Sequence, residues 1–227
     1  DINFKAKKGE MVAFIGSTGS GKSTLVNLIP RFYDVTNGAI KINNKDIRDY
    51  DLLDLRDHLG VIPQKAILFS GTIKDNIRFG KKDATDDEIE HAAKIAQAYD
   101  FIMAKEHGFD EEISEGATNV SGGQKQRLSI ARALVRKAPI YIFDDSFSAL
   151  DFKTDAILRK ELKKEMSNSI MLVVAQRISS IMDADQIIVL NEGKVVGHGT
   201  HQQLLKECKI YYEIAISQLS EEELAHE

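Results

Sequence analysis

Two hydrophobic periods alternate along the 227 residues of this chain. Short continuous apolar runs, typical of buried parallel strands, are separated by stretches with apolar residues three and four positions apart, typical of helices. This alternation predicts an α/β fold with a parallel sheet covered on both faces by helices. The expected strands are residues 11–15, 61–62, 140–143, 170–175 and 187–190.

Turn signals add two smaller parts. Asn37-Gly38 and Asn43-Asn44 bound a short alternating run at 39–42, which predicts a small antiparallel sheet. From about residue 70 to 136 the helical period dominates, and capping boxes are expected at Thr85–Glu88 and Ser121–Gln124. We therefore expect a helical insertion near the middle of the chain.

The polar stretch Gly16-Ser17-Thr18-Gly19-Ser20-Gly21-Lys22-Ser23-Thr24 lies between the first predicted strand and the first predicted helix. It fits G-x-x-x-x-G-K-[ST], which needs that strand and helix around it. The glycines let backbone N–H groups point at a polyphosphate, and the helix N-terminus adds donors. The Lys22 ammonium suits the β- and γ-phosphates, and the Ser23 hydroxyl suits Mg²⁺. A nucleotide site is expected here, against the alternative of a Gly/Ser-rich turn that binds nothing.

Composition narrows the classes of function. The net charge of −5 with both signs mixed argues against a nucleic-acid partner. No apolar run approaches the roughly 18 residues of a membrane span, and no leader sequence is expected. The single cysteine, Cys208, allows no internal disulfide and fits a reducing compartment. The histidines show no metal-ligand spacing, and we expect His198 and His201 on the surface.

A second element, an apolar run that ends in an aspartate, completes the nucleotide site. The apolar run Ile140–Phe143 ends in Asp144, where a carboxylate can hold Mg²⁺, usually through water. With the other motifs in chain order, nearly the whole sequence resembles the nucleotide-binding domain of an ABC transporter. The motifs are Gly16–Thr24 (Walker A), Gln64 (Q-loop), Asn119–Arg127 (signature), Ile140–Asp145 (Walker B) and Ser148–Asp151 (D-loop). The segment Pro63–Ile73 resembles the multidrug-like exporter branch, in which this loop faces the membrane domain.

The resemblance implies a RecA-like P-loop NTPase core from residues 1–69 and 137–227, with a helical signature subdomain at 70–136. It implies the cofactors ATP and Mg²⁺, with the metal organised by Ser23, Gln64 and Asp144. The partners implied are the transmembrane domain of the same transporter and a second nucleotide-binding domain, at the cytoplasmic face of the cell membrane. In a head-to-tail dimer, a capped helix start with free donors serves the opposite ATP through Ser121, Gly122, Gly123 and Gln124.

Two positions depart from the family pattern. The family usually has a glutamate after the Mg²⁺-binding aspartate, but Asp145 stands here and withdraws the base by roughly 1.5 Å. The family usually has a switch histidine after the strand expected at residues 170–175, but Gln176 stands here and cannot pass a proton. One acid–base group contributes on the order of 10²–10⁴ in rate. Slow hydrolysis is therefore expected at this site, and sequence drift without consequence is the alternative.

An intact signature beside a weakened site suits one half of a heterodimer, in which Ser121 and Gly123 complete the partner's competent site. Two other classes stay open. One is a soluble ABC ATPase of DNA repair or translation, although neither a long coiled coil nor a second cassette is visible. The other is a regulatory module that only binds ATP. Residues 1–15 offer only Phe4 and Phe14 as aromatics, and neither is assigned to the adenine.

Overall fold

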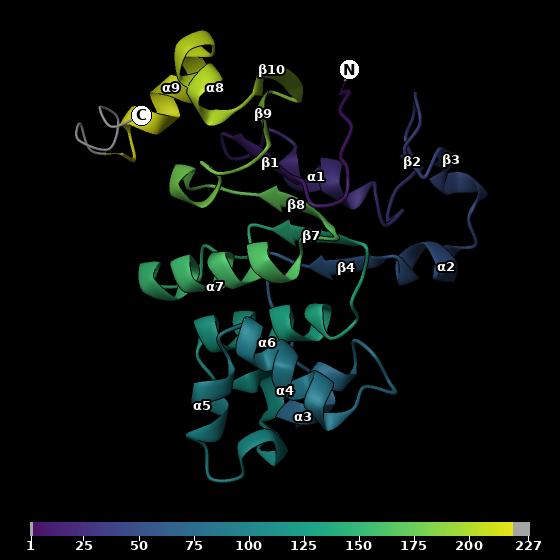
Figure 1. The fold of residues 1–227 in the computed structure, drawn as a ribbon, viewed down its shortest axis with the longest axis vertical. Helices are drawn as coiled ribbons and strands as arrows, with labels where there is room; N and C mark the ends of the chain where they lie inside the picture. Colours follow the sequence, from purple (N-terminus) through teal and green to yellow (C-terminus); the bar gives the residue numbers. More distant parts are fainter. Residues whose placement is uncertain (1, 220–227) are drawn as a thin grey trace.

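A six-stranded sheet forms the centre of the computed structural model, which describes residues 2–219 (Figure 1). The strand order is β10-β9-β1-β8-β7-β4. Five strands run parallel, and the edge strand β10 runs antiparallel to β9. The strands are β1 (Met11–Gly16), β4 (Leu59–Ile62), β7 (Ile140–Asp144), β8 (Ile170–Val174), β9 (Gln186–Asn191) and β10 (Lys194–Gly199).

The five apolar runs in the sequence all form strands of this sheet because both of its faces are buried. Neighbouring residues of β1 belong to different apolar clusters: Ala13 packs on one face, and Phe14 packs on the other. Val173 and Val174 of β8 divide in the same way. The predicted α/β class with a parallel sheet is confirmed, and β10 makes the sheet mixed.

Helices cover the two faces unequally. The helices α6 (Gly122–Leu134), α7 (Phe152–Glu165) and α9 (Lys209–Ile216) bury side chains in the larger cluster. The short helix α1 (Lys22–Asn27) packs Val26 into the smaller one. Ile2, Phe4 and Ala6 are not part of a strand, but their apolar side chains pack against the same smaller cluster.

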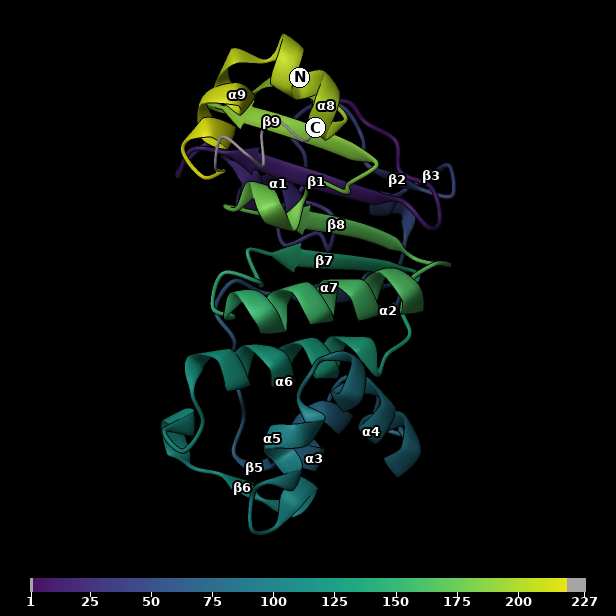
Figure 2. The ribbon, with the colours of Figure 1, turned by 60° about the vertical axis from the view of Figure 1, so that its left-hand side comes forward.

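The predicted helical insertion is present between β4 and β7. Figure 2 shows its helices together, and Figure 1 places them beyond the β4 edge of the sheet, while α8 (His201–Glu207) and α9 lie at the β10 edge. Both expected capping boxes, at Thr85 and Ser121, are formed. The insertion comprises α3 (Ile73–Arg78), α4 (Asp86–Ile95), α5 (Tyr99–Met103), α6 and a two-stranded sheet of β5 (Gly71–Thr72) and β6 (Glu112–Ile113).

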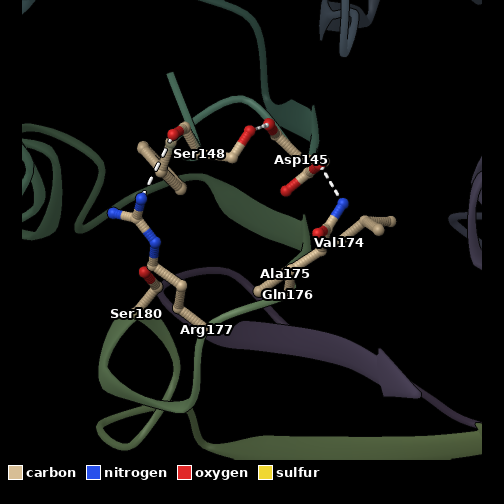
Figure 3. Close-up of a pocket in the computed structure, with 8 residues that line it drawn as sticks. Asp145, Ser148, Val174, Ala175, Gln176, Arg177 and Ser180 are labelled. Carbon is tan, nitrogen blue, oxygen red and sulfur yellow. Dashed lines mark hydrogen bonds between the residues drawn. The ribbon is translucent and has the colours of Figure 1, made fainter. Parts of the chain in front are cut away.

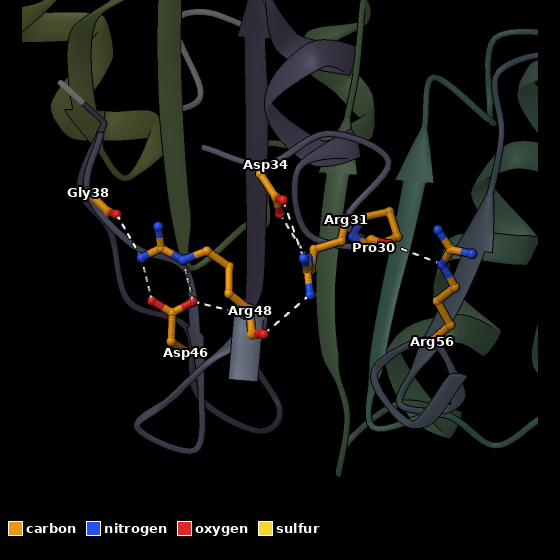
Figure 4. A network of polar contacts seen from close by, with 7 residues as sticks. All are labelled: Pro30, Arg31, Asp34, Gly38, Asp46, Arg48 and Arg56. Carbon is orange, nitrogen blue, oxygen red and sulfur yellow. Dashed lines mark hydrogen bonds and ion pairs between the residues drawn. The ribbon is translucent and has the colours of Figure 1, made fainter. Parts of the chain in front are cut away.

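The small antiparallel sheet is also present and consists of β2 (Lys41–Ile42) and β3 (Lys45–Asp46), followed by α2 (Leu52–Asp57). Arginines tie it to the segment after α1 (Figure 4). Arg48 pairs with Asp46 at 2.7 Å, and Arg31 pairs with Asp34 at 2.8 Å while reaching the Arg48 carbonyl oxygen at 3.4 Å. The remaining short 3-10 helices are Ile47–Asp49, Gly108–Asp110, Glu115–Ala117 and Ile178–Ser180.

One surface prediction is wrong. His198 is exposed as expected, but His201 is buried, and its Nδ1 lies 2.5 Å from the Tyr211 hydroxyl. Among residues 2–219, no helix combines the length and the apolar character that crossing a membrane requires. The boundaries at 69/70 and 136/137 stay predictions, and residues 1 and 220–227 of the predicted core lie outside the described part.

Candidate nucleotide site

The carboxyl ends of the parallel strands gather the motif residues at one edge of the sheet, where α/β folds place their ligands. Gly16 ends β1, Asp144 ends β7, and Gln176 lies just after β8. The registers Phe14↔Val174 and Asp144↔Val174 bring these three strand ends level. Gln64 follows β4, the neighbour of β7, by two residues.

The phosphate loop curls between β1 and α1 because its glycines permit it. A Cβ on Gly16 would lie 2.0 Å from the Leu190 carbonyl oxygen, so no other residue fits against β9 there. Gly19 and Gly21 have left-handed φ angles of 82° and 95°. No atom lies within 4 Å of a Cβ built on Gly19, so the space at this position is open.

Lys22 lies inside this loop with 8% of its surface exposed. Its Nζ donates to the carbonyl oxygens of Gly16 and Ser17, both at 2.8 Å, and to Ser20 Oγ at 3.2 Å. Burial lowers the pKa of Lys22, while the carboxylates of Asp145 and Asp144 oppose that shift. The ammonium therefore lies at the centre of the loop and close to both acids.

Ser23 and Asp144 meet across 121 positions of sequence, with Ser23 Oγ donating to Asp144 Oδ1 at 2.7 Å. A hydroxyl and a carboxylate side by side are hard oxygen donors of the kind that Mg²⁺ prefers. Among residues 2–219 no group of three or more His, Cys, Asp and Glu side chains could hold a metal ion. A cation at this point would take its remaining oxygens from phosphates and water, which is how Mg²⁺ is usually held.

Asp145 is buried at the turn after β7 and has a left-handed φ of 48°. Its Oδ2 accepts hydrogen bonds from Gln64 Nε2 at 3.1 Å and from Gln176 Nε2 at 2.5 Å (Figure 3). Burial raises the pKa of Asp145, although these amides and Ser148 act in the opposite direction. Gln64 and Gln176 therefore both contact Asp145, and the three predicted catalytic side chains form one group.

A small pocket adjoins this group. Asp145 and Gln176 line one side of it, and Ser148, Arg177 and Ser180 line the other (Figure 3). Arg177 donates to the Ser148 carbonyl oxygen at 3.3 Å, and its guanidinium lies 4.9 Å from the Phe152 ring centroid. These contacts attach the segment after β8 to the predicted D-loop.

Within the described residues, Ser121 to Gln124 of the signature form no hydrogen bond with this group. Ser121 Oγ accepts from Gln124 N at 3.2 Å, and Gln124 Oε1 accepts from Ser121 N at 2.9 Å, which completes the cap of α6. Gly122 is exposed, and no atom lies within 4 Å of a Cβ built on it. Within residues 2–219, no hydrogen bond joins Ser121, Gly122, Gly123 or Gln124 to the phosphate loop.

Sequence reasoning missed residues that hold this site in shape. Ser146 Oγ donates to the Ile62 carbonyl oxygen at 3.0 Å and so fixes the strand end that precedes Gln64. Gln218, near the end of the described chain, bonds the backbone around Gln176. No periodicity or motif marks either residue, because both act through long-range contacts with backbone groups.

Comparison with known proteins agrees with this geometry. Residues 1–148 match the ABC transporter family. A Staphylococcus aureus protein whose name describes a multidrug export ATP-binding/permease protein is 47% identical over 211 residues, covering 93% of this chain and 36% of its own length. An ABC transporter ATP-binding protein of Mycobacterium bovis is 46% identical over 221 residues, covering 96% and 38%.

A solved structure described as a bacterial Atm1-family ABC exporter with ATP bound has a TM-score of 0.90 and 39% identity to this chain. It is matched over 94% of this chain and 38% of its own length. This chain belongs to the ABC transporter family and has the α/β ABC ATPase fold. It spans little more than a third of the relatives that it matches.

Proposed function

We propose that this chain is the ATP-binding domain of an ABC exporter and binds MgATP at residues 16–24. The contact between Ser23 and Asp144, beside the buried Lys22, carries this proposal. Lys22 would exchange its loop carbonyls for the β- and γ-phosphates, and Ser23, Gln64 and Asp144 would organise Mg²⁺. The metal would neutralise charge on the phosphates.

We also propose that this site hydrolyses ATP slowly. Asp145 and Gln176 take the positions of the water-activating base and the γ-phosphate switch. One carboxylate oxygen of Asp145 accepts hydrogen bonds from two amide donors. The amide of Gln176 cannot accept a proton to become a cation. The chain therefore binds ATP and turns it over slowly. The exposed helix start at Ser121 and Gly122 would complete the competent site of a second, non-identical nucleotide-binding domain.

Exposed aromatic side chains that follow Gln64 in the sequence support a membrane partner. Phe69 is 45% exposed and Phe79 is 64% exposed, and their ring centroids lie 4.7 Å apart. Contiguous apolar side chains on a surface can form a contact site for another protein. The segment that carries Phe69 follows Gln64, so a transmembrane domain docked there would be placed to sense the nucleotide. The relatives named as ATP-binding/permease proteins support such a partner.

Binding and turnover with purified protein test the proposal. The chain alone is expected to bind MgATP with very low phosphate release, and Lys22→Ala should abolish binding. Mixed with a partner that carries glutamate and histidine at the positions of Asp145 and Gln176, it should give strong turnover. Brisk ATPase activity from this chain alone would refute the weak-site proposal. Binding without any turnover in the mixture would favour the regulatory module instead.

A further inference from the structure

Gln218 forms two hydrogen bonds with the backbone that follows β8. Its Oε1 accepts from Ile178 N at 2.8 Å, and its Nε2 donates to the Gln176 carbonyl oxygen at 2.8 Å. One side-chain amide thus pairs with a donor and an acceptor two residues apart, as a neighbouring strand would. The partners are 40 and 42 positions away in sequence, so the contact is tertiary.

Gln218 lies in the turn directly after α9, and this helix is firmly placed. Tyr211 and Ala215 of α9 are fully buried in the larger apolar cluster. The Tyr211 hydroxyl lies 2.5 Å from His201 Nδ1 on α8, and the two rings meet edge to face at 5.6 Å. Gln218 N closes the helix end on the Ala215 carbonyl oxygen at 3.0 Å. The side chain of Gln218 therefore extends from a segment that is fixed by the packing of α9.

The backbone that Gln218 bonds carries Gln176, the side chain proposed to contact the γ-phosphate. Gln176 Nε2 contacts Asp145, while the next residue, Arg177, is tied to Ser148. Residues 176–178 are thus held on one side by the segment after β7 and on the other by Gln218. Without Gln218, the carbonyl of Gln176 and the amide of Ile178 would lose a fixed partner, and the direction of the Gln176 side chain would be less defined.

We propose that Gln218 is a positioning residue, which fixes the backbone of residues 176–178 and through it the amide of Gln176. The proposal rests on the proposed function in one respect, namely that Gln176 faces the γ-phosphate. It makes the C-terminal end of α9 part of the site that distinguishes ATP from ADP. A side chain outside every nucleotide motif then contributes to that distinction.

The test compares Gln218→Ala with Ser217→Ala in the protein. Ser217 is exposed on the same turn, and among residues 2–219 its hydroxyl bonds only the local Ile214 carbonyl oxygen at 2.7 Å, so it controls for loosening of the helix end. Hydrogen–deuterium exchange should show faster exchange of the Ile178 amide in Gln218→Ala and no change in Ser217→Ala. Calorimetry should show about tenfold weaker binding of ATPγS, the effect of about one hydrogen bond, with ADP binding within about twofold of wild type.

Gln176→Ala separates failure of this inference from failure of the proposed function. If Gln176→Ala changes the ATPγS-to-ADP ratio and Gln218→Ala does not, the positioning role is wrong. Unchanged Ile178 exchange in Gln218→Ala, or equal changes in Ser217→Ala, overturns it as well. If Gln176→Ala leaves the ratio unchanged, the γ-phosphate contact of the proposed function is wrong, and the exchange result alone decides whether Gln218 fixes the backbone.

Discussion

Gln176 Nε2 lies 2.5 Å from Asp145 Oδ2, so the two residues that depart from the family pattern contact each other directly. Gln64 donates to the same oxygen at 3.1 Å. A carboxylate held by two amides cannot turn freely toward a water molecule, and an amide bonded to a carboxylate has only its second N–H left for a phosphate. Each departure therefore reinforces the other.

Restoring the longer acid and the imidazole should raise hydrolysis at this site. Asp145→Glu extends the base by one methylene, and Asp145→Glu with Gln176→His adds a group that can carry a proton. We expect phosphate release to rise about tenfold or more in the double variant, within the range of one acid–base group. Because the side chains touch, the two changes should not be additive. Adding Lys22→Ala should remove the gain, and a double variant no faster than wild type contradicts the weak-site proposal.

Gly122→Ala should separate the stability of this chain from its role toward a partner. A Cβ at 122 meets no atom within 4 Å, so alanine should stabilise the start of α6 by up to about 1 kcal/mol. The same methyl group would fill the space proposed for the partner's ATP and should cut turnover in the mixture at least tenfold. Urea unfolding and phosphate release measure the two effects. Full turnover in the mixture would remove the signature from the proposed dimer site.

Arg132 should be the costliest arginine to remove. Its guanidinium donates to the Ile67 and Asn76 carbonyl oxygens, both at 2.8 Å, and lies 4.9 Å from the Phe69 ring centroid. Burial lowers its pKa to about 10. Arg132→Ala should destabilise the chain by about 2–4 kcal/mol in urea unfolding, because the Ile67 carbonyl oxygen and the part-buried Asn76 carbonyl oxygen lose their donor.

Two further variants sharpen the Arg132 prediction. Arg132→Lys keeps the charge but cannot donate in a planar fork, so its cost should lie between that of wild type and alanine. Lys125→Ala, on the same helix with one exposed contact to the Gly116 carbonyl oxygen at 3.3 Å, should stay within about 0.5 kcal/mol of wild type. An Arg132→Ala protein as stable as Lys125→Ala would contradict this account of the α6 contacts.

Glu88 gives the helical insertion a defined pH dependence. Lys81 first and Lys137 second, together with the Thr85 amide, lower the pKa of Glu88 from 4.5 to about 2. A lowered pKa means that the stabilisation is fully present above 4.5 and is lost as the pH falls through about 2. Glu88→Gln should therefore be less stable than wild type at pH 7, and the difference should narrow between pH 4.5 and 2.

Urea unfolding at several pH values measures the Glu88 effect. High salt should also reduce the difference at pH 7, because the ion pairs are partly exposed. Glu90→Gln is a suitable control, since Glu90 makes one exposed pair with Lys94 at 2.5 Å on the same helix. A difference between Glu88→Gln and wild type that does not depend on pH would show that the charge of Glu88 is not its cause.

The parts predictable from sequence were those with a local signature. The phosphate loop follows from glycine spacing, the strands follow from apolar runs, and the capping boxes at Thr85 and Ser121 follow from residues three apart. Asp144 was expected to share Mg²⁺ with Ser23 because it ends an apolar run and because the motifs in chain order resemble those of an ABC transporter. His201 was misplaced because its partner, Tyr211, comes from the next helix, and no period in the chain reveals that pairing.

The Lys22 ammonium bonds three oxygens of its own loop. It thus acts as an internal positive charge that keeps the loop curved. Entry of a triphosphate becomes an exchange of partners at a preformed shell rather than the folding of a loose loop. Neutralising this side chain should consequently loosen the loop itself, because its carbonyl oxygens would lose the ammonium and bond to water instead.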